Sequence, residues 1–459
     1  MKKIILAIIV LVVACLPFYG NKVVKETIAK RFEVLDSYGL KSKLIKEDKG
    51  YLKTKLSYKL EVKDKEKFLQ YIQQFSSSQL PLYTQNLIDG VEFGADMSFN
   101  NFPLSDKLSV DLYPVKLSDK IMDEIKSEDE NIYNFINKIL KKKAIFYHID
   151  YGVVNGDFSG FVKDFKEVLV LKNNSSIDLS IEGINFNGKG LLIAPETLRT
   201  SIKRFDMQLS KKDENVKITS KGFKTVSNFE SDTTYISTIH VKEGSFNYTN
   251  KITSEDFKME LDSLTLEGSS NTQGKKAKFF AKADIDTLKI EAAAQKYIFK
   301  NFNYDILLNN VDKKSFIQLQ QLAKIASSQE LTQDEELMAQ KNMLEIFANG
   351  FDLKIADLSL EKLSTQKDKY IEGFKINALL HVEKDIDFVK KYQTNPSSLA
   401  NNITFKSNVV FSKDFYGVLN MIYPVDLVLG QYKKEIASKI IFDISLKNSL
   451  LMINSKPVK

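Results

Sequence analysis

The stretch Phe351-Asp-Leu-Lys-Ile-Ala-Asp-Leu-Ser-Leu-Glu361 decides the fold of this chain. Three apolar residues alternate with other residues, two residues intervene, and two further apolar residues alternate. Successive side chains of a β-strand point to opposite faces, so the two apolar sets share a face only if the strand changes parity at Ala356-Asp357. One bulge residue or one sharp bend would produce that change. The stretch therefore predicts a strand that keeps one apolar face through an irregularity.

The same pattern recurs along the chain. Phe257-Lys-Met-Glu-Leu-Asp-Ser-Leu-Thr-Leu-Glu267 matches its apolar pattern position for position, Ile177-Asp-Leu-Ser-Ile-Glu-Gly-Ile-Asn-Phe-Asn187 fits as well, and Phe442-Asp-Ile-Ser-Leu446 opens a fourth copy. The unequal spacing of the copies excludes a solenoid of fixed period. The copies indicate an α+β fold: one large, curved, mostly antiparallel β-sheet built from repeated strand units, with helices inserted. The residues expected in the core are Phe257, Leu261, Leu264, Leu266, Phe351, Ile355, Leu358 and Leu360.

A helical pattern precedes most of these strands. Ser127 and Glu130 have the spacing of a capping box, and apolar residues recur behind them at helical intervals. These residues are Ile132, Phe135, Ile136, Ile139 and Leu140. Their face either packs within the chain or binds a partner protein. The first interpretation is favoured, because single chains seldom expose such patches.

A second helical pattern extends from Ser315 to Ala348. Thr332 and Glu335 have the spacing of another capping box, and Asn349-Gly350 supplies a C-terminal stop. The apolar face expected for this helix consists of Leu337, Leu344, Phe347 and Ala348.

The N-terminus has the pattern of a signal-anchor. Lys2 and Lys3 precede an apolar run from Ile4 to Tyr19. At ~1.5 Å per residue the run is somewhat shorter than a ~30 Å hydrocarbon core, and flanking lysines can extend to the interfaces to cover the difference. The basic start favours the cytoplasmic side, so the rest of the chain would be exported. The run therefore predicts an uncleaved transmembrane helix.

Two alternatives to an uncleaved anchor remain open. Val12-Val-Ala-Cys15 resembles a lipobox, in which Cys15 would become the lipidated first residue, and a cleavage site after Ala14 would release the chain. In the favoured interpretation the chain comprises a transmembrane anchor (1–20), an N-terminal α+β region (21–144), a β-rich region (145–312), a helical insert (313–350) and a C-terminal β-rich region (351–459).

Charge and composition exclude several classes of protein. A hydrophobic content of 43% is too high for a disordered chain. The 66 basic and 59 acidic residues give a net charge of +7, but Arg occurs only at Arg31, Arg199 and Arg204. Base recognition and bidentate phosphate binding favour Arg, so we expect no nucleic-acid partner. The single cysteine, Cys15, excludes an intrachain disulfide and a cysteine-based metal site.

No catalytic signature is present in the sequence. His148, His240 and His381 lie far apart and have no metal-ligand spacing. Walker A, dinucleotide-binding and nucleophile-elbow motifs are absent. We therefore expect a protein that is not an enzyme and needs no cofactor or metal. An envelope hydrolase is the least favoured interpretation.

Several short elements resemble those of a known family. They are Lys2-Lys3, Gly20-Asn-Lys22, Lys49-Gly-Tyr-Leu-Lys-Thr54, Asn100-Asn-Phe-Pro-Leu104, the helical segment near 315–348 and Leu451-Met-Ile-Asn454. Together they resemble the YdgA-like family of bacterial envelope proteins, although Asn100 and Asn101 stand near the places of that family's His and Gly-Pro residues. The resemblance implies a periplasmic domain on an inner-membrane anchor and kinship with AsmA-like proteins, whose curved sheets handle lipid. It implies no activity and no catalytic residue.

Together these observations predict a single-pass protein of the inner membrane with the bulk of its chain in the periplasm. Its expected function is binding or scaffolding, with lipid as a candidate ligand. The expected partners are the inner membrane, lipid and other envelope proteins. The alternative is a structural partner of an envelope machine, such as a motility or secretion complex.

Overall fold

The computed structural model describes most of the chain outside its N-terminus. The described residues are 21–75, 88–102, 107–152, 154–192, 194–231, 233–293, 295–326, 330–366 and 369–458. The predicted anchor at 1–20, including Cys15, lies outside them. Contacts divide the chain into unit 1, which ends at Lys212, and unit 2, from Asp213 to Lys459. This division falls inside the 145–312 region expected from the sequence.

Unit 1 is an antiparallel sheet with helices. Its strands are β1 (Leu40–Lys49), β2 (Lys53–Val62), β3 (Glu92–Asn100), β4 (Lys107–Lys116), β5 (Tyr147–Gly152), β6 (Asp157–Val162), β7 (Phe165–Val170), β8 (Ser176–Glu182), β9 (Ile184–Leu191) and β10 (Ala194–Ser210). Its helices are 21–37, α2 (Lys65–Phe75), α4 (Asp119–Glu128) and α5 (Glu130–Lys141). Neighbouring strands pair in chain order, and the broken strands β6–β7 and β8–β9 each act as one long strand.

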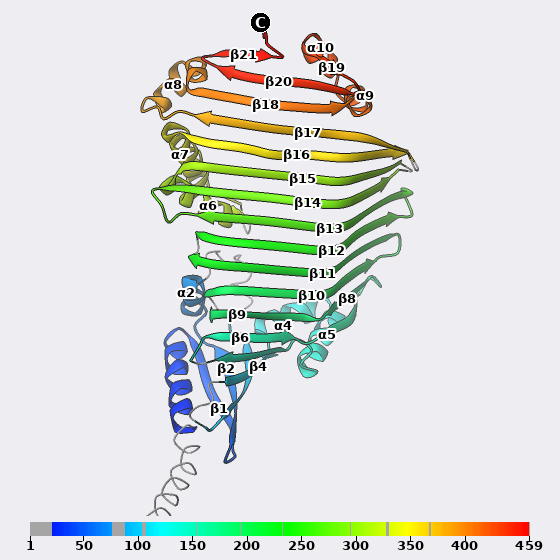
Figure 1. The fold of residues 1–459 in the computed structure, drawn as a ribbon. Helices are drawn as coiled ribbons and strands as arrows, with labels where there is room; N and C mark the ends of the chain where they lie inside the picture. Colours follow the sequence, from blue (N-terminus) through cyan, green and yellow to red (C-terminus); the bar gives the residue numbers. More distant parts are fainter. Residues whose placement is uncertain are drawn as a thin grey trace, which may run out of the picture. The chain divides into compact units, whose positions relative to one another are not determined.

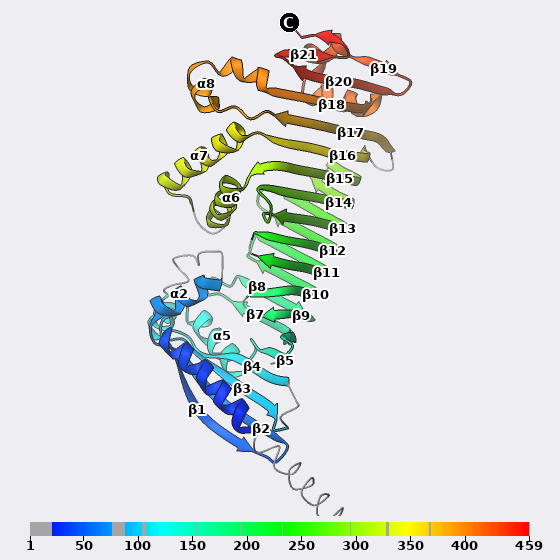
Figure 2. The same cartoon turned by 60° about the vertical axis from the view of Figure 1, so that its left-hand side comes forward.

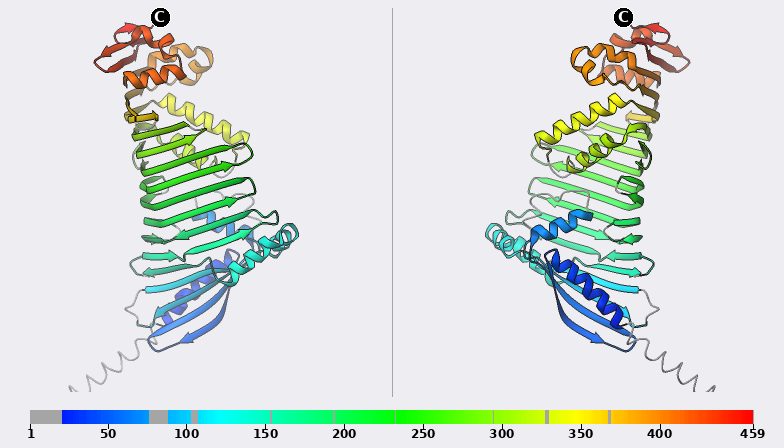
Figure 3. Two further views of the ribbon diagram at one scale, coloured as in Figure 1. Left: turned by 90° about the vertical axis from the view of Figure 1, so that its right-hand side faces the viewer. Right: turned by 90° about the vertical axis from the view of Figure 1, so that its left-hand side faces the viewer.

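The core of unit 1 lies between its first helix and its first strands. Ile28 and Phe32 of the helix over 21–37 are buried against Leu56 and Leu60 of β2 and Phe99 of β3. Figure 3 shows this helix, in blue, lying against those strands. The helix over 21–37 is therefore part of the fold of unit 1.

Unit 2 is a larger antiparallel sheet (Figure 1). Its strands are β11 (Glu214–Ser231), β12 (Thr234–Asn250), β13 (Glu255–Asn271), β14 (Lys276–Ala292), β15 (Gln295–Asp312), β16 (Phe351–Gln366), β17 (Lys369–Val382), β18 (Ile403–Ser412), β19 (Lys434–Ile436), β20 (Lys439–Lys447), β21 (Leu450–Ile453) and β22 (Lys456–Pro457). Strands β11 to β18 pair in chain order, β20 pairs with β18, β19 and β21, and β21 pairs with β22. Its helices are α6 (Lys313–Ala326), α7 (Gln333–Asn349), α8 (Phe388–Thr394), α9 (Lys413–Ile422) and α10 (Val425–Leu429).

The parity change predicted from the repeat has two physical forms. In the copies at 177–187 and 257–267 the seventh residue is left-handed: Gly183 has φ +66° and Ser263 has φ +53°. Strand β13 bends there without an extra residue, since its pairing with β12 and β14 keeps one register. In β16, Asp305 pairs with Asp357 and Ile306 with Ile355, so Ala356 is a bulge residue. Both the bend and the bulge expected from the sequence therefore occur.

Three left-handed residues in the long strands of unit 2 form one transverse row, which we call the crease. Gly222 of β11 and Asn301 of β15 have φ +65° and +52°, like Ser263 between them. The register of the neighbouring residue pairs places Lys242 of β12 between Gly222 and Ser263. In the same way it places Asp286 of β14 between Ser263 and Asn301. Figure 1 shows the long strands bending part way along their length. The crease thus bends the sheet across several strands.

The helix caps agree with the sequence in part. Thr332 and Glu335 form the expected capping box, and Gly350 ends α7 with φ +70°. The capping box predicted at Ser127 is wrong, because the Ser127 hydroxyl donates to the Glu124 carbonyl (2.7 Å) inside α4. Asp129 caps α5 instead, as its carboxylate accepts from the backbone N–H of Asn131 (2.9 Å). A carboxylate one residue before the helix suits both the free N–H groups and the helix dipole.

One residue predicted on the apolar face of the second helical pattern is also wrong. Leu337 is 56% exposed, whereas Leu344, Phe347 and Ala348 are half-buried. The buried residues of α7 are Asn342 and Ile346. The first turns of α7 therefore extend away from the sheet, and only its second half packs on the core.

The crease makes a sharp stability prediction. A non-glycine residue at positive φ costs about 1–2 kcal/mol, so Ser263→Gly should raise the free energy of unfolding by about 0.5–1 kcal/mol after the added chain entropy is subtracted. Ser269 lies on the same strand at ordinary φ, and Ser269→Gly should instead lower it by about 0.5–1 kcal/mol. Denaturant unfolding midpoints of the two variants measure both effects. Destabilisation by both changes would contradict the strained crease.

Candidate functional site

One face of the unit 2 sheet is apolar from strand to strand. Direct cross-strand partners share a face, so the registers place the alternating apolar residues of β13 to β16 together. They are Met259, Leu261, Leu264 and Leu266; Ile285, Leu288 and Ile290; Phe299, Phe302, Tyr304 and Ile306; and Leu353, Ile355, Leu358 and Leu360. We call this surface the apolar face. It continues onto Phe374 and Ile376 of β17 and onto Val409 and Phe411 of β18.

The crease and the bulge keep this face intact. Leu261 lies before Ser263 and Leu264 after it, yet their partners Leu288 and Ile285 belong to the same apolar set. Without the parity change, every residue beyond Ser263 would turn to the other face. The irregularities are therefore what extends the apolar face across the bend.

In the described part of the chain, the helices pack on the margins of the apolar face. Phe316 of α6 and Ile346 of α7 are buried with Ala277, Val311 and Phe351 at one end of the strands. Figure 2 shows α6 and α7 beside the ends of β14 to β16.

A second cluster covers the face farther along the sheet. Tyr416 of α9 packs with Phe442 of β20, and Asp426 accepts a hydrogen bond from the Tyr416 hydroxyl (2.7 Å). Burial and this carboxylate acceptor raise the pKa of Tyr416. This helix therefore covers the sheet over β17, β18 and β20.

Between these covers the apolar side chains are half-buried. Phe351 and Leu360 are buried, as expected, but Phe257, Leu261, Leu264, Leu266, Ile355 and Leu358 are only half-buried. The prediction of full burial is wrong for these six, because a single sheet layer covers its own side chains only through cross-strand neighbours. Among the described residues no second layer covers the central apolar face, which is therefore an open apolar surface.

The opposite face of the same strands carries charge. Lys258 and Lys289 both bond the carboxylate of Glu260, at 2.6 and 3.3 Å, and Lys296 bonds Glu291 at 2.6 Å. The hydrogen bond from Lys258 lowers the pKa of Glu260, and that from Lys296 lowers the pKa of Glu291. Such exposed pairs add little stability, but they keep this face in water. The sheet is thus amphipathic across its thickness.

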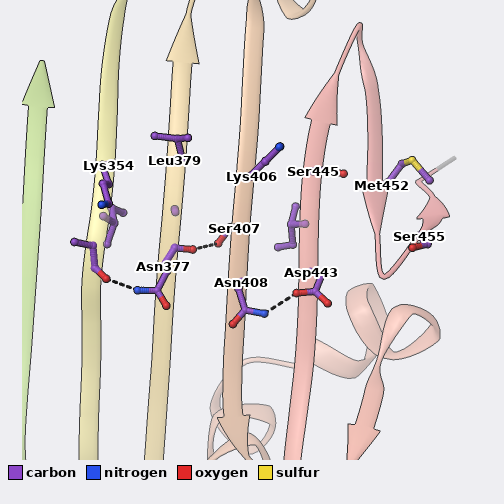
Figure 4. A pocket seen from close by; sticks show the side chains of 14 residues that line it. Lys354, Asn377, Leu379, Lys406, Ser407, Asn408, Asp443, Ser445, Met452 and Ser455 are labelled. Carbon is purple, nitrogen blue, oxygen red and sulfur yellow. Dashed lines mark hydrogen bonds between the residues drawn. The ribbon is translucent and has the colours of Figure 1, made fainter. Parts of the chain in front are cut away.

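A hollow of ≈ 960 Å³ lies beside the bulge of β16, with Asn377, Asn408 and Asp443 among its lining residues (Figure 4). The Asn377 amide donates to the Ala356 carbonyl, and the Asn408 amide donates to Asp443 (2.6 Å). These bonds hold the irregular strands together, so the polar groups serve the sheet. The hollow is therefore a weaker candidate for a binding site than the apolar face.

The histidines remain on separate strands. His148 bonds Asp111 (2.6 Å), His381 bonds Asp352 (2.6 Å), and His240 bonds the hydroxyl of Thr265 (3.2 Å). Among the described residues, no group of three or more His, Cys, Asp or Glu side chains is placed to hold a metal ion.

The apolar face of α5 packs on unit 1. Ile139 is buried, and Ile132, Phe135, Ile136 and Leu140 are half-buried where α5 contacts β4 and β7. Lys138 and Lys142 bond Glu167 of β7 at 2.6 and 3.2 Å. This geometry favours packing within the chain over the alternative of a partner surface.

Three of the short elements quoted for the family resemblance meet in one buried cluster. The Asn21 amide donates to the Thr54 hydroxyl (2.5 Å) and to the Asn101 carbonyl oxygen (3.0 Å), and the Asn101 amide donates to the backbone carbonyls of Gly50 (2.7 Å) and Tyr51 (3.0 Å). Asn21, Thr54 and Asn101 are each at most 3% exposed. We call these three residues the polar latch. Their separation along the chain hid this contact from sequence reasoning.

Comparisons with known proteins add no assignment. No protein-family model, no curated protein and no solved structure matches this chain. Within the described residues, no helix is both long and apolar enough to cross a bilayer. The family resemblance and the membrane anchor therefore stay predictions.

Packing of α5 can be tested with adjacent residues. Phe135→Asp places a carboxylate under α5 and should destabilise unit 1 by about 3 kcal/mol or more, because it removes a packed ring and desolvates a charge. The control Asn134→Asp changes an exposed neighbour and should leave the unfolding transition unchanged. Calorimetry of the two variants measures this difference. A stable Phe135→Asp protein that no longer captures an envelope partner would make this face an interaction site.

Proposed function

We propose that the protein is a non-enzymatic component of the bacterial cell envelope whose apolar face binds lipid acyl chains. In this proposal residues 1–20 anchor it in the inner membrane and the bulk of the chain lies in the periplasm. The observation that carries the lipid part is the open apolar face of unit 2, which is charge-free on β13 to β16. Apolar side chains of this kind bind by excluding water and transfer no proton or group.

The form of the apolar face suits extended, flexible ligands. At ~4.8 Å between neighbouring strands, the apolar face from β13 to β18 extends roughly 24 Å across the sheet. A rigid small molecule would need an enclosed pocket with a few converging polar groups, whereas acyl chains need only a long apolar track. Each methylene moved from water onto such a track contributes about 0.8 kcal/mol.

A structural role beside other envelope proteins is the second candidate. An exposed apolar patch at the end of α9 and in α10 favours it. The patch consists of Met421 (86% exposed), Ile422, Tyr423, Leu427 (85% exposed) and Val428. Exposed patches of this density mark interaction surfaces in soluble domains.

Photocrosslinking from two adjacent residues separates these functions. Leu288 lies on the apolar face, whereas the next residue, Thr287, lies on the charged face beside Lys300 and Asp262. A benzophenone amino acid at 288 of the full chain, activated in intact cells, should give phospholipid adducts detected by mass spectrometry. The same group at 287 should give none, which controls for lipid around the anchor.

Two results would replace the lipid proposal. Equal lipid yields at 287 and 288 would mean that adducts come from the surrounding membrane, not from the apolar face. Protein adducts at 288 without lipid would favour the second candidate.

The anchor has its own test. Ile8→Asp with Ile9→Asp should release or mislocalise the chain, because each carboxylate at the centre of a spanning segment costs about 2.5–3.5 kcal/mol on insertion. Ile8→Leu with Ile9→Leu keeps the apolar run and should stay in the membrane fraction. Intact-mass analysis of the native protein should give the uncleaved chain. Cleavage before Cys15 would contradict the anchor, and a lipid adduct on Cys15 would identify a lipoprotein.

A further inference from the structure

The turn between β1 and β2 presents apolar side chains to the surface of unit 1. Tyr51 is 51% exposed and Leu52 is 59% exposed at the turn, and Ile45 is 58% exposed on β1. The β1–β2 hairpin otherwise belongs to the core through Leu56 and Leu60. Its tip is therefore an outward extension of a rigid element.

The same hairpin is strongly basic. Its exposed lysines nearest the turn are Lys46, Lys49, Lys53 and Lys55, whereas Lys41 and Lys43 lie toward the other end of β1. The acidic residues between Leu40 and Leu56 are Glu47, which bonds Lys25 (2.7 Å), and Asp48. Basic side chains around an exposed aromatic and an aliphatic residue are complementary to anionic lipid headgroups above an acyl layer.

The polar latch fixes where this tip lies. Asn21 bonds Thr54, and Asn101 bonds the carbonyls of Gly50 and Tyr51, so the turn is held beside the residue at which the described chain begins. The apolar run of the sequence ends at Tyr19, two residues earlier. Two residues span at most about 7 Å, so a bilayer that holds the run would reach its interface beside the turn.

We propose that the β1–β2 tip, with Tyr51, Leu52 and the surrounding lysines, docks on the anionic surface of the membrane that holds the N-terminal run. This inference rests on the anchor of the proposed function. Tyr51 lies at headgroup level, Leu52 enters the acyl boundary, and the lysines bind phosphate oxygens of the lipids. Together with the latch, this contact sets the orientation of unit 1 on the bilayer.

The absence of Trp from the sequence permits a clean test. Leu52→Trp places the only indole of the full chain at the tip. Val154→Trp is the control, because Val154 is 86% exposed in another hairpin turn of unit 1. Each variant is reconstituted in nanodiscs containing phosphatidylglycerol, with and without brominated acyl chains.

The Trp emission of the tip variant should be blue-shifted in these discs, and brominated lipid should quench most of its intensity. The control should show neither effect. Discs of phosphatidylcholine alone should weaken the quenching at the tip. A reconstituted Leu52→Trp chain that is not quenched would overturn the inference while leaving the anchor intact. A blue shift without quenching would assign the tip to a protein contact and overturn it as well. A chain that fails to enter the discs would instead contradict the anchor, and the inference with it.

Discussion

The architecture of unit 2 depends on one constraint: alternate side chains of a strand point to opposite faces. A bent sheet can keep one apolar face only if every strand changes parity where it bends. Here the change is made by left-handed residues such as Ser263 and Asn301, and in β16 also by the bulge at Ala356. Glycine at Gly222 adopts this conformation without a Cβ penalty, whereas serine and asparagine adopt it at a cost. The strain is offset because the apolar side chains on both sides of the bend then pack together.

The repeat predicted this constraint because parity can be read directly from apolar spacing. The sequence did not separate a bend from a bulge, since both shift the apolar pattern by one residue. The copy at 351–361 illustrates the limit: its predicted flip is the bulge at Ala356, but a further change of parity lies between Leu360 and Leu363, where the crease crosses β16. The spacing of apolar residues in one strand shows that its parity changes. The crease could not be predicted in this way, because it depends on how several strands pair.

Other parts of the fold depended on contacts that sequence spacing does not contain. The spacing of Ser127 and Glu130 predicted a cap at Ser127, but the helix begins later, and Asp129 caps α5 with its extended backbone and its carboxylate. Leu337 matched a helical period, but it lies on the exposed side of the first turns of α7 and is 56% exposed. The polar latch joins residues from three separate segments, so no local window could reveal it. The apolar side of the sheet was predicted as core, and its openness follows from the absence of a second layer over its centre among the described residues.

The buried polar latch fixes the position of the helix over 21–37 relative to the β1–β2 hairpin. If the helix over 21–37 shifts, the buried Asn21 amide loses its hydrogen bonds to Thr54 and Asn101, and each buried group left unpaired would then cost about 1–3 kcal/mol. Apolar contacts such as those of Ile28 tolerate small displacements, because dispersion has little directional preference. Hydrogen bonds do not tolerate them, so the latch specifies the register between the helix and the β1–β2 hairpin. Hydrophobic packing therefore provides the stability of this corner, and the latch provides the single arrangement in which the chain emerging at Asn21 is joined to the sheet.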